Sequence, residues 1–413
     1  MVIFKVSSLR LAALAAAAFV AAASVTRAAD VSDVRTGVHS DRTRLVIELN
    51  ARVPYKIFTL ANPYRVVIDF PELDWRIPTP KSARKRGLIS NYRYGLFQNA
   101  NSRLVVDVRG PVAIAGHRFI PPKGRYKHRF VVDLRKVSNA AFQRSERQIA
   151  SKDWVEPRAA ISDTAGRNGN RTAHLRGRKN GRGKRIVMID PGHGGPDPGT
   201  ISIAGVYEKS VTLRTARIVR QVLEKTGRYT VVLTRKKDIY VPLRKRYKRA
   251  EDSNAELFIS LHADSNRNKR LRGFSVYTLS ERASDKEAAA LAAHENRADA
   301  IAGIDLSRQS DAVASFLIEL RQRQTMNESA IFSELLIDEL SRKVKMLRNT
   351  HRFAGFAVLK SPDIPSILLE LGYLSNKQDA RMLHKKSYLK KAATAILKAA
   401  DRYFERKERL SRS

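Results

Sequence analysis

The stretch RIVMIDPGHGGPDPG, at residues 185–199, is the clearest guide to the fold of the second half of the chain. Six strand-like, mostly apolar residues run into a turn of glycines and prolines that contains one histidine, His193. In an open α/β sheet, the carboxyl ends of the strands face the crevice where ligands bind. Gly192, Gly194 and Gly195 let the backbone fold tightly past the strand end without bulky neighbours. The stretch therefore predicts a β-strand that ends in a functional loop.

An alternation of strands and helices follows this stretch as far as residue 408 and predicts an α/β domain with a mixed central sheet of about six strands. We expect strands at residues 185–190, 229–235, 256–262, 273–279, 355–360 and 366–371. We expect amphipathic helices at residues 211–225, 242–254 and 387–406. Residues 281–350 are helical in composition and interrupt the alternation between the fourth and fifth strands, which predicts a helical insertion.

The first half of the chain contains a repeated strand pattern. One copy contains RLVIEL at Arg44 and RVVIDF at Arg65, and the second copy contains RLVVDV at Arg103 and RFVVDL at Arg129. Turn residues connect these β-branched segments, and each copy of the repeat pairs two similar strands. The pattern predicts an N-terminal all-β sandwich with internal pseudosymmetry over residues 30–138. Its histidines stand apart in the sequence, so we expect a binding role rather than a metal site.

The N-terminal residues and the amino-acid composition indicate the compartment of the protein and the metal ligands that it can offer. Lys5 and Arg10 precede an apolar run at residues 11–24, and small residues follow it, which is typical of a secretory signal peptide over residues 1–29. An uncleaved membrane anchor is the alternative. The 413-residue chain has no cysteine, so a metal site would use nitrogen and oxygen ligands. An exported chain of this kind is expected in the periplasm.

The formal net charge of +38 reflects 78 Lys and Arg against 40 Asp and Glu. Residues 139–184 lack an apolar pattern, and residues 164–185 contain eight basic residues, five glycines and no acid. We read residues 139–184 as a flexible basic linker, which acts either as a spacer or as an adhesive for an anionic envelope surface. Because no zinc-finger spacing or aromatic-rich RNA-binding segment accompanies the charge, nucleic acid is not an expected partner.

Further chemistry-bearing residues follow in sequence order. His262 ends the apolar segment LFISLHAD, Glu208 begins a predicted helix 15 residues after His193, and Glu370 lies inside the apolar segment SILLELGYLSN. Taken singly, each has a structural explanation as a turn, helix-start or strand-end residue. Together, two imidazoles and one carboxylate match the ligands of a catalytic Zn²⁺, which keeps a fourth position open for water. A remaining carboxylate near such a water can accept its proton.

In this order, IVMIDPGHGG, YEKSVTL, LFISLHAD and SILLELGYLSN resemble the zinc-dependent N-acetylmuramoyl-L-alanine amidases of the family-3 type. The resemblance covers residues 185–406, and the duplicated β domain is similar to the AMIN module that accompanies such amidases. The resemblance implies that His193, Glu208 and His262 bind Zn²⁺ and that Glu370 is the catalytic carboxylate. The expected substrate is peptidoglycan, cut between N-acetylmuramic acid and the first L-alanine of the stem peptide. A septal role in daughter-cell separation is implied as well.

The resemblance also gives the insertion a role, because division-associated amidases carry a helix there that plugs the active site until a protein activator, here of the LytM type, displaces it. In the segment LAAHENRADAIAGIDLS, Glu295 is the acid expected to take the open position on zinc. Glu281 and Glu287 are alternatives, and a solvated helix face is the structural explanation for Glu295. His294 would point about 100° away from Glu295 on a helix.

Two other functions remain open at this point. A peptidoglycan-tethering protein would use the β domain and the basic linker without catalysis. An exported zinc peptidase acting on free peptides would share the metal and the general base with an amidase.

Overall fold

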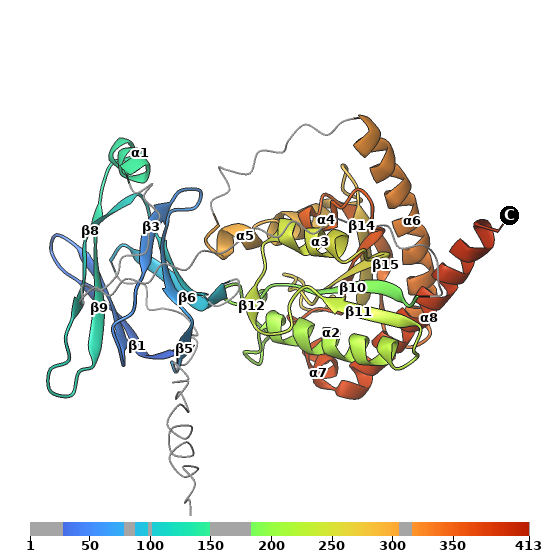
Figure 1. The fold of residues 1–413 in the computed structure, drawn as a ribbon, viewed down its shortest axis with the longest axis horizontal. Helices are drawn as coiled ribbons and strands as arrows, with labels where there is room; N and C mark the ends of the chain where they lie inside the picture. Colours follow the sequence, from blue (N-terminus) through green and yellow to red (C-terminus); the bar gives the residue numbers. More distant parts are fainter. Residues whose placement is uncertain (1–27, 78–86, 98–100, 149–182, 305–315, 413) are drawn as a thin grey trace, which may run out of the picture.

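The computed structural model describes residues 28–77, 87–97, 101–148, 183–304 and 316–412. The chain forms a β-rich half and an α/β half, which lie side by side (Figure 1). The predicted signal peptide falls outside the described residues apart from its last two positions, and β1 begins at Ala29. Most of the predicted linker, residues 149–182, also lies outside them. Among the described helices, none has the length and apolar character needed to cross a bilayer.

The β-rich half consists of two packed sheets, which confirms the predicted sandwich. Its strands are β1 (Ala29–Val38), β2 (Thr43–Leu49), β3 (Lys56–Leu60), β4 (Arg65–Pro71), β5 (Leu73–Trp75), β6 (Ile89–Phe97), β7 (Asn101–Val108), β8 (Val112–Ile120) and β9 (His128–Lys136). One sheet has the order β5-β1-β2-β9-β8, and in the other β6-β7-β4-β3 are neighbours. The repeated segments form β2, β4, β7 and β9, and the antiparallel pairs β2–β9 and β4–β7 each combine one strand from each copy. The internal repeat is therefore a pseudosymmetric pair of sheets.

A helix continues the β half into the predicted linker. Helix α1 (Asn139–Gln148) contains Phe142, which is 1% exposed and meets the ring of Tyr64 edge to face at 5.0 Å between centroids. The first ten residues expected as flexible linker are thus helical, and Phe142 anchors them to the sandwich, because one buried aromatic ring is a large apolar contact for a short helix.

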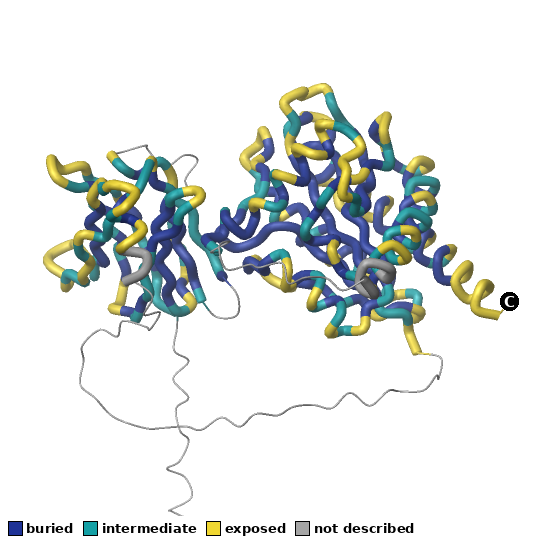
Figure 2. The backbone as a smooth tube through the Cα atoms, turned by 90° about the horizontal axis from the view of Figure 1, so that it is seen from above, coloured by how far each residue is buried: buried dark blue, intermediate teal, exposed yellow. Residues whose placement is uncertain are grey.

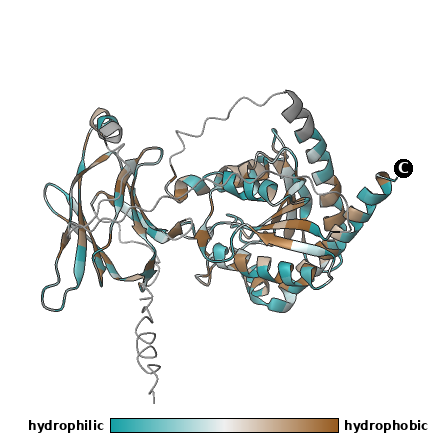
Figure 3. Ribbon diagram, viewed as in Figure 1, coloured by the Kyte–Doolittle hydropathy of each residue, from teal (hydrophilic) through white to brown (hydrophobic). Residues whose placement is uncertain are grey.

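The α/β half is built on a mixed six-stranded sheet, as predicted, with the order β11-β10-β13-β16-β14-β15. Its strands are β10 (Arg185–Pro191), β11 (Tyr229–Leu233), β13 (Leu257–His262), β14 (Phe274–Leu279), β15 (Met346–Ala354) and β16 (Ser366–Glu370). The first four strands of that order are parallel to one another, and β14 runs antiparallel to β16. These strands are mostly hydrophobic and buried (Figures 2 and 3), as expected for a sheet covered on both faces.

Helices cover both faces of this sheet. One layer contains α2 (Glu208–Glu224), α6 (Phe316–Ser341) and α8 (Lys386–Leu410), whose apolar residues share one core with the strands. The other face carries α3 (Leu243–Asp252), α4 (Lys286–Glu295) and a short 3₁₀ turn, η2 (Ala357–Leu359). Helices α5 (Ala298–Ile301) and α7 (Lys377–His384) complete the described elements of this half.

The predicted strand at residues 355–360 is wrong. The fifth strand of the six-stranded sheet in sequence is β15, and the predicted segment contains η2, where Val358 and Leu359 are buried. Short apolar runs suit a buried turn as well as a strand. The true strand lies at the sheet edge and has the polar sequence MLRNTHRFA, so its pattern does not stand out.

The predicted insertion at residues 281–350 is too long. Helix α6 lies inside that range, yet Phe332, Leu336 and Leu340 are fully buried in the main core beside α8. Their spacing of four residues places them on one helical face, which is the pattern of a core helix. The part of the range that is separate from the main core contains α4 and α5.

The two halves share one sheet. Strand β12 (Ile239–Tyr240) belongs to the α/β half but pairs in parallel with β6, so that Ile239 lies opposite Leu96. The close approach depends on glycine, because a Cβ on Gly95 would lie 2.4 Å from the carbonyl carbon of Gly195. The loop that follows β10 therefore rests against the edge of the β half.

Candidate metal centre and active site

The candidate site lies at the carboxyl ends of three neighbouring parallel strands. β10 ends just before His193, β13 ends at His262, and β16 ends at Glu370. His262 and Glu370 are register partners across the β13–β16 pair. Glu208 is the first residue of α2, where a carboxylate is favoured by the helix dipole. The topology therefore brings together the residues singled out from the sequence.

The loop after β10 adopts a conformation that few residues tolerate. His193 itself has φ +61°, in the left-handed region that is uncommon for residues with a Cβ. A Cβ on Gly192 would lie 2.4 Å from the His262 ring, and one on Gly199 would lie 2.6 Å from the His193 ring. Glycine at these positions lets the two imidazoles approach, and a strained histidine at a strand end is typical of functional sites.

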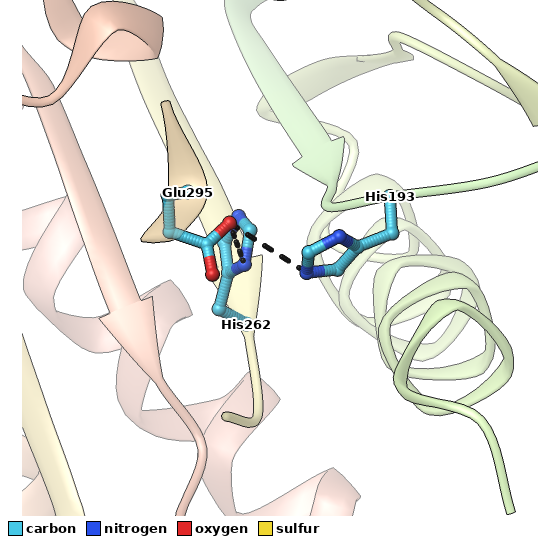
Figure 4. A group of neighbouring side chains, drawn as sticks. All are labelled: His193, His262 and Glu295. Carbon is cyan, nitrogen blue, oxygen red and sulfur yellow. Dashed lines mark ion pairs between the residues drawn. The ribbon is translucent and has the colours of Figure 1, made fainter. Parts of the chain in front are cut away.

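Four side chains present nitrogen or oxygen atoms to one common point. His193 Nε2 lies 3.2 Å from Glu208 Oε1 and 3.6 Å from Glu295 Oε2. His262 Nδ1 lies 3.3 Å and 3.1 Å from the same two oxygens. Figure 4 shows the carboxylate of Glu295 facing both imidazoles. Ligands held about 2.0–2.2 Å from a tetrahedral zinc ion lie about 3.3–3.6 Å from one another, so these separations fit such an ion.

Unpartnered polar atoms occur in the same cluster of residues. His193 Nε2, His262 Nδ1, Glu295 Oε1 and Glu370 Oε1 are buried without a hydrogen-bond partner in the protein. Such atoms are costly to bury unless a ligand or ion meets them. The cluster also has excess negative charge, since its two imidazoles are surrounded by buried carboxylates. These are Asp197, Glu208, Asp264, Glu295 and Glu370. The donor set and its charge suit a divalent cation with nitrogen and oxygen ligands.

The surroundings of Glu208 and Glu370 shift the pKa values of these two carboxyl groups in opposite directions. Burial raises the pKa of Glu208, but the neighbouring His193 and His262 outweigh it and hold the pKa well below the usual value. Burial raises the pKa of Glu370 well above the usual value, and the charges of Glu208, Asp264 and Glu295 act in the same direction. One carboxylate is thus poised to stay ionised and the other to accept a proton.

Hydrogen bonds fix the orientation of these groups. Glu208 Oε1 accepts from the Ala263 backbone N–H at 2.7 Å, and its Oε2 accepts from the Thr200 N–H at 2.9 Å. Glu370 Oε2 accepts from the Asp264 N–H at 3.1 Å, which leaves Oε1 free. The two carboxylates therefore present defined oxygens to the site.

The residues that support this cluster were not identified from the sequence. Asp197 Oδ2 lies 2.9 Å from His193 Nδ1, the usual second partner of a metal-binding imidazole. Arg246 donates to the His193 carbonyl at 3.0 Å, and Arg235 donates to the Gly192 carbonyl at 2.9 Å. The spacing HGGPD was a usable signal for Asp197. Arg235 and Arg246 lie further along the chain, and no sequence motif connects them with His193.

Glu295 reaches the cluster from the last turn of α4. A carboxylate there opposes the helix dipole, yet Glu295 is only 4% exposed. The alternatives lie elsewhere, since Glu281 is exposed and Glu287 pairs with Arg352 at 3.0 Å. His294 has a 42% exposed side chain and lies 4.0 Å from Asp264. Among these acids, Glu295 is the one beside the imidazoles.

Comparisons with known proteins agree with this architecture. The family model described as N-acetylmuramoyl-L-alanine amidase (Amidase_3) matches residues 187–402, and the AMIN domain model matches residues 33–134. The chain is 32% identical to the N-acetylmuramoyl-L-alanine amidase AmiC of Neisseria meningitidis serogroup B, over 93% of this chain and 92% of that protein. It is also 32% identical to AmiC of an Escherichia coli O6:H1 strain, over 92% of this chain and 91% of that protein.

Among solved structures, the N-acetylmuramoyl-L-alanine amidase AmiC2 of Nostoc punctiforme is 26% identical, with a TM-score of 0.39 and coverage of 55% of this chain and 99% of that one. The two sequence relatives span nearly the whole chain, and the amidase model alone spans more than half of it. The chain therefore belongs to the Amidase_3 family of N-acetylmuramoyl-L-alanine amidases and carries an AMIN domain ahead of its catalytic half.

Proposed function

We propose that this amidase uses Zn²⁺ held by His193, Glu208 and His262 to cut the amide between N-acetylmuramic acid and the stem peptide's L-alanine in peptidoglycan. The observation that carries the proposal is that His193 Nε2 and His262 Nδ1, both buried without a hydrogen-bond partner, converge on Glu208 Oε1 at 3.2 and 3.3 Å. Such a convergence is expected of a site that binds an ion and is not expected of a packed core.

The chain's own residues supply binding, orientation and proton transfer. Zinc in such a site acts as a Lewis acid and lowers the pKa of water to about 7. Asp197 orients the His193 ring through Nδ1, so that Nε2 faces the cluster. The free Oε1 of Glu370 accepts the proton of the attacking water as the C–O bond forms. Glu370 then returns that proton to the leaving L-alanine nitrogen as the C–N bond breaks.

Glu295 accounts for regulation in this proposal. Its Oε2 lies 3.6 Å from His193 Nε2 and 3.1 Å from His262 Nδ1, so that it would compete with water and substrate for an ion held there. An enzyme closed in this way has low basal activity and needs a protein activator of the LytM type to displace α4. Such control suits an enzyme that splits the septal wall, where unregulated hydrolysis would harm the cell.

The remaining parts of the chain fit an exported enzyme. We assign residues 1–29 to a signal peptide, 30–138 to the AMIN-like domain, 139–184 to a basic linker that begins with the anchored helix α1, and 185–408 to the catalytic domain. The AMIN-like domain directs the enzyme to the envelope, and the basic linker is suited to anionic surfaces. The periplasm, with enrichment at the septum, is the expected location.

Incubation of the zinc-loaded Glu295→Ala protein, which lacks the inhibitory carboxylate, with purified sacculi tests the proposal. We expect stem peptides to be released with a new L-alanine amino terminus, identified by mass spectrometry, while the glycan strands stay intact. A tethering protein would bind sacculi and release nothing. A peptidase would cut free stem peptides between amino acids, and either result would contradict the proposal.

A further inference from the structure

The outer face of the sheet β6-β7-β4-β3 is covered by residues of the segment that follows Glu295. Three arginines of this sheet donate to backbone carbonyls of that segment. Arg65 donates to Ala300, Arg93 donates to Ile301 at 2.6 Å, and Arg103 donates to Gly303 at 2.8 Å. Arg65 and Arg103 are 1% and 6% exposed, so these charge-assisted hydrogen bonds are shielded from water.

The segment is shaped to fit this face. Helix α5 ends at Ile301, and the turn after it is closed by a hydrogen bond of 3.0 Å from the Gly303 N–H to the Ala300 carbonyl, which also accepts from Arg65. Gly303 follows with φ +73° and lies on the sheet, since a Cβ there would be 3.1 Å from methyl groups of both Val67 and Val105. Glycine is therefore required at this position both for its backbone conformation and for its close approach.

The pseudosymmetry of the β half provides a comparison within the same domain. On the other sheet, Arg44 pairs with Asp133 at 2.7 Å, as Arg103 pairs with Asp69 at 2.6 Å. Arg35 pairs with Glu48, as Arg93 pairs with Asp107. This second face has the same charge arrangement, but in the described part of the chain no hydrogen bond joins it to residues 298–304. Coverage by α5 is specific to one of two similar faces.

The segment that covers this face, residues 298–304, lies close to Glu295 in the sequence and is fixed to the catalytic half. Two residues separate Glu295 from α5, and Asn296 exchanges hydrogen bonds of 2.8 Å with Gly355 and Ala357 of the catalytic half. Asp299 in α5 accepts from the Tyr240 hydroxyl at 2.7 Å. A small apolar cluster, composed of Phe97, Tyr240, Ala298 and Ala302, joins the β half, the catalytic half and this segment. Movement of the segment on the sheet is thereby coupled to the carboxylate at the candidate metal centre.

We propose that the outer face of the sheet β6-β7-β4-β3 is a binding surface for residues 298–304 of the chain itself, and that it holds Glu295 in the closed position. The AMIN domain is then a component of the inhibited state in addition to any role in envelope binding. This inference rests on the proposed function, because it assigns Glu295 the inhibitory role. The closed state has two anchors, one at the imidazoles and one on the β sheet.

Four full-length variants, compared with wild type, test the proposal from both sides of the contact. Arg103→Ala removes donors to the segment, and Arg44→Ala is its matched control, since it breaks the equivalent ion pair on the other face.

Gly303→Val pushes the segment away from Val67 and Val105. Its control is Gly227→Val, at a glycine with φ +74° where an added Cβ would meet no atom within 4 Å, so that it reproduces the backbone strain alone. Hydrogen exchange of residues 286–304 and hydrolysis of dye-labelled sacculi are measured for each.

We expect Arg103→Ala and Gly303→Val to lose amide protection across residues 286–304 and to raise basal hydrolysis on the order of tenfold, equivalent to 1.4 kcal/mol. The controls should match wild type in both measurements. Unchanged amide protection in Gly303→Val, or an equal loss of protection in Arg44→Ala, would overturn the proposal. So would a loss of protection in Arg103→Ala and Gly303→Val without a rise in hydrolysis, if Glu295→Ala does raise hydrolysis. If every variant including Glu295→Ala fails to hydrolyse sacculi, the proposed function fails, and the exchange data still decide whether the sheet binds the segment.

Discussion

Two buried clusters of charge lie a few residues apart in the catalytic half, and they differ in how their polar atoms are satisfied. Asp190, at the end of β10, accepts from Arg246 at 2.9 Å and from Ser260 at 2.8 Å, and also from Thr234. Three residues later, His193 begins a cluster in which four buried atoms have no hydrogen-bond partner, namely His193 Nε2, His262 Nδ1, Glu295 Oε1 and Glu370 Oε1. A buried charge cluster whose polar atoms all have partners is typical of a structural role, whereas buried polar atoms without partners are typical of a site that binds an ion.

The sharpest test of this contrast removes a proposed metal ligand. We expect His193→Ala and His262→Ala to lose zinc and to reduce hydrolysis to background, because the remaining ligands make a poor zinc site. Metal analysis of the purified proteins measures this directly, and treatment of wild type with a chelator should reproduce the loss of activity. Stoichiometric zinc in either variant would show that the ligand set is different.

The second test separates proton transfer from metal binding. Glu370→Gln keeps the size of the side chain but removes its proton acceptor, so we expect turnover to fall by about 10²–10⁴-fold with zinc retained. Activity of the activated enzyme and zinc content are measured together. A metal-free variant, or one with near wild-type turnover, would assign Glu370 another role.

The third test concerns the satisfied cluster. Asp190→Ala leaves the buried Arg246 guanidinium without its carboxylate, and we expect the free energy of unfolding of the catalytic half to fall by about 3–5 kcal/mol. Urea denaturation followed by circular dichroism at the helix band measures it. The exposed pair of Asp338 and Arg342 is the control, and Arg342→Ala should leave the free energy of unfolding almost unchanged, because water screens this pair. Equal costs would remove the distinction between the clusters.

The fourth test addresses the plug. Glu295→Ala should raise hydrolysis without activator on the order of tenfold, because the carboxylate no longer competes for the site. Dye release from labelled sacculi provides the measurement. If Glu281→Ala or Glu287→Ala activates the enzyme and Glu295→Ala does not, the plug belongs to another acid of the segment.

The smallest expected effect comes from the other end of α4. Hydrogen bonds from Arg352 lower the pKa of Asp285 from 3.8 to about 2, and Asp285 also caps the helix at Ala288. Because the folded pKa is depressed, this anchor stabilises the docked helix fully above about pH 3.8 and weakens as the pH falls through about 2. Pepsin cleavage of residues 286–295 should therefore increase in this range for wild type. Asp285→Asn, which retains a capping side chain, should show a smaller pH dependence, and identical profiles would contradict this role.

Much of the architecture followed from local pattern. The repeated RLVIEL-type segments predicted paired strands because alternation of inward and outward residues is a property of consecutive positions. His193 and His262 were placed at strand ends for the same reason, since an apolar run that stops at a polar residue is visible in the sequence. The predictions for α6, as part of an insertion, and for β15, which was not expected as a strand, are wrong. Packing of a helix into the core and pairing of a polar strand at a sheet edge both depend on residues far away in the sequence.

The order of residues was enough to establish the two domain types, the succession of chemistry-bearing motifs and the internal repeat of the β half. The folded chain was needed to establish that Asp197 supports His193, that Glu295 reaches the imidazoles, and that one arginine face is covered by α5 while its counterpart is not. Hydrophobic periodicity is a property of a few neighbouring residues, so it can be recognised in the sequence. The hydrogen bond from Arg103 to the Gly303 carbonyl joins positions 200 residues apart and forms only after both halves have folded against each other.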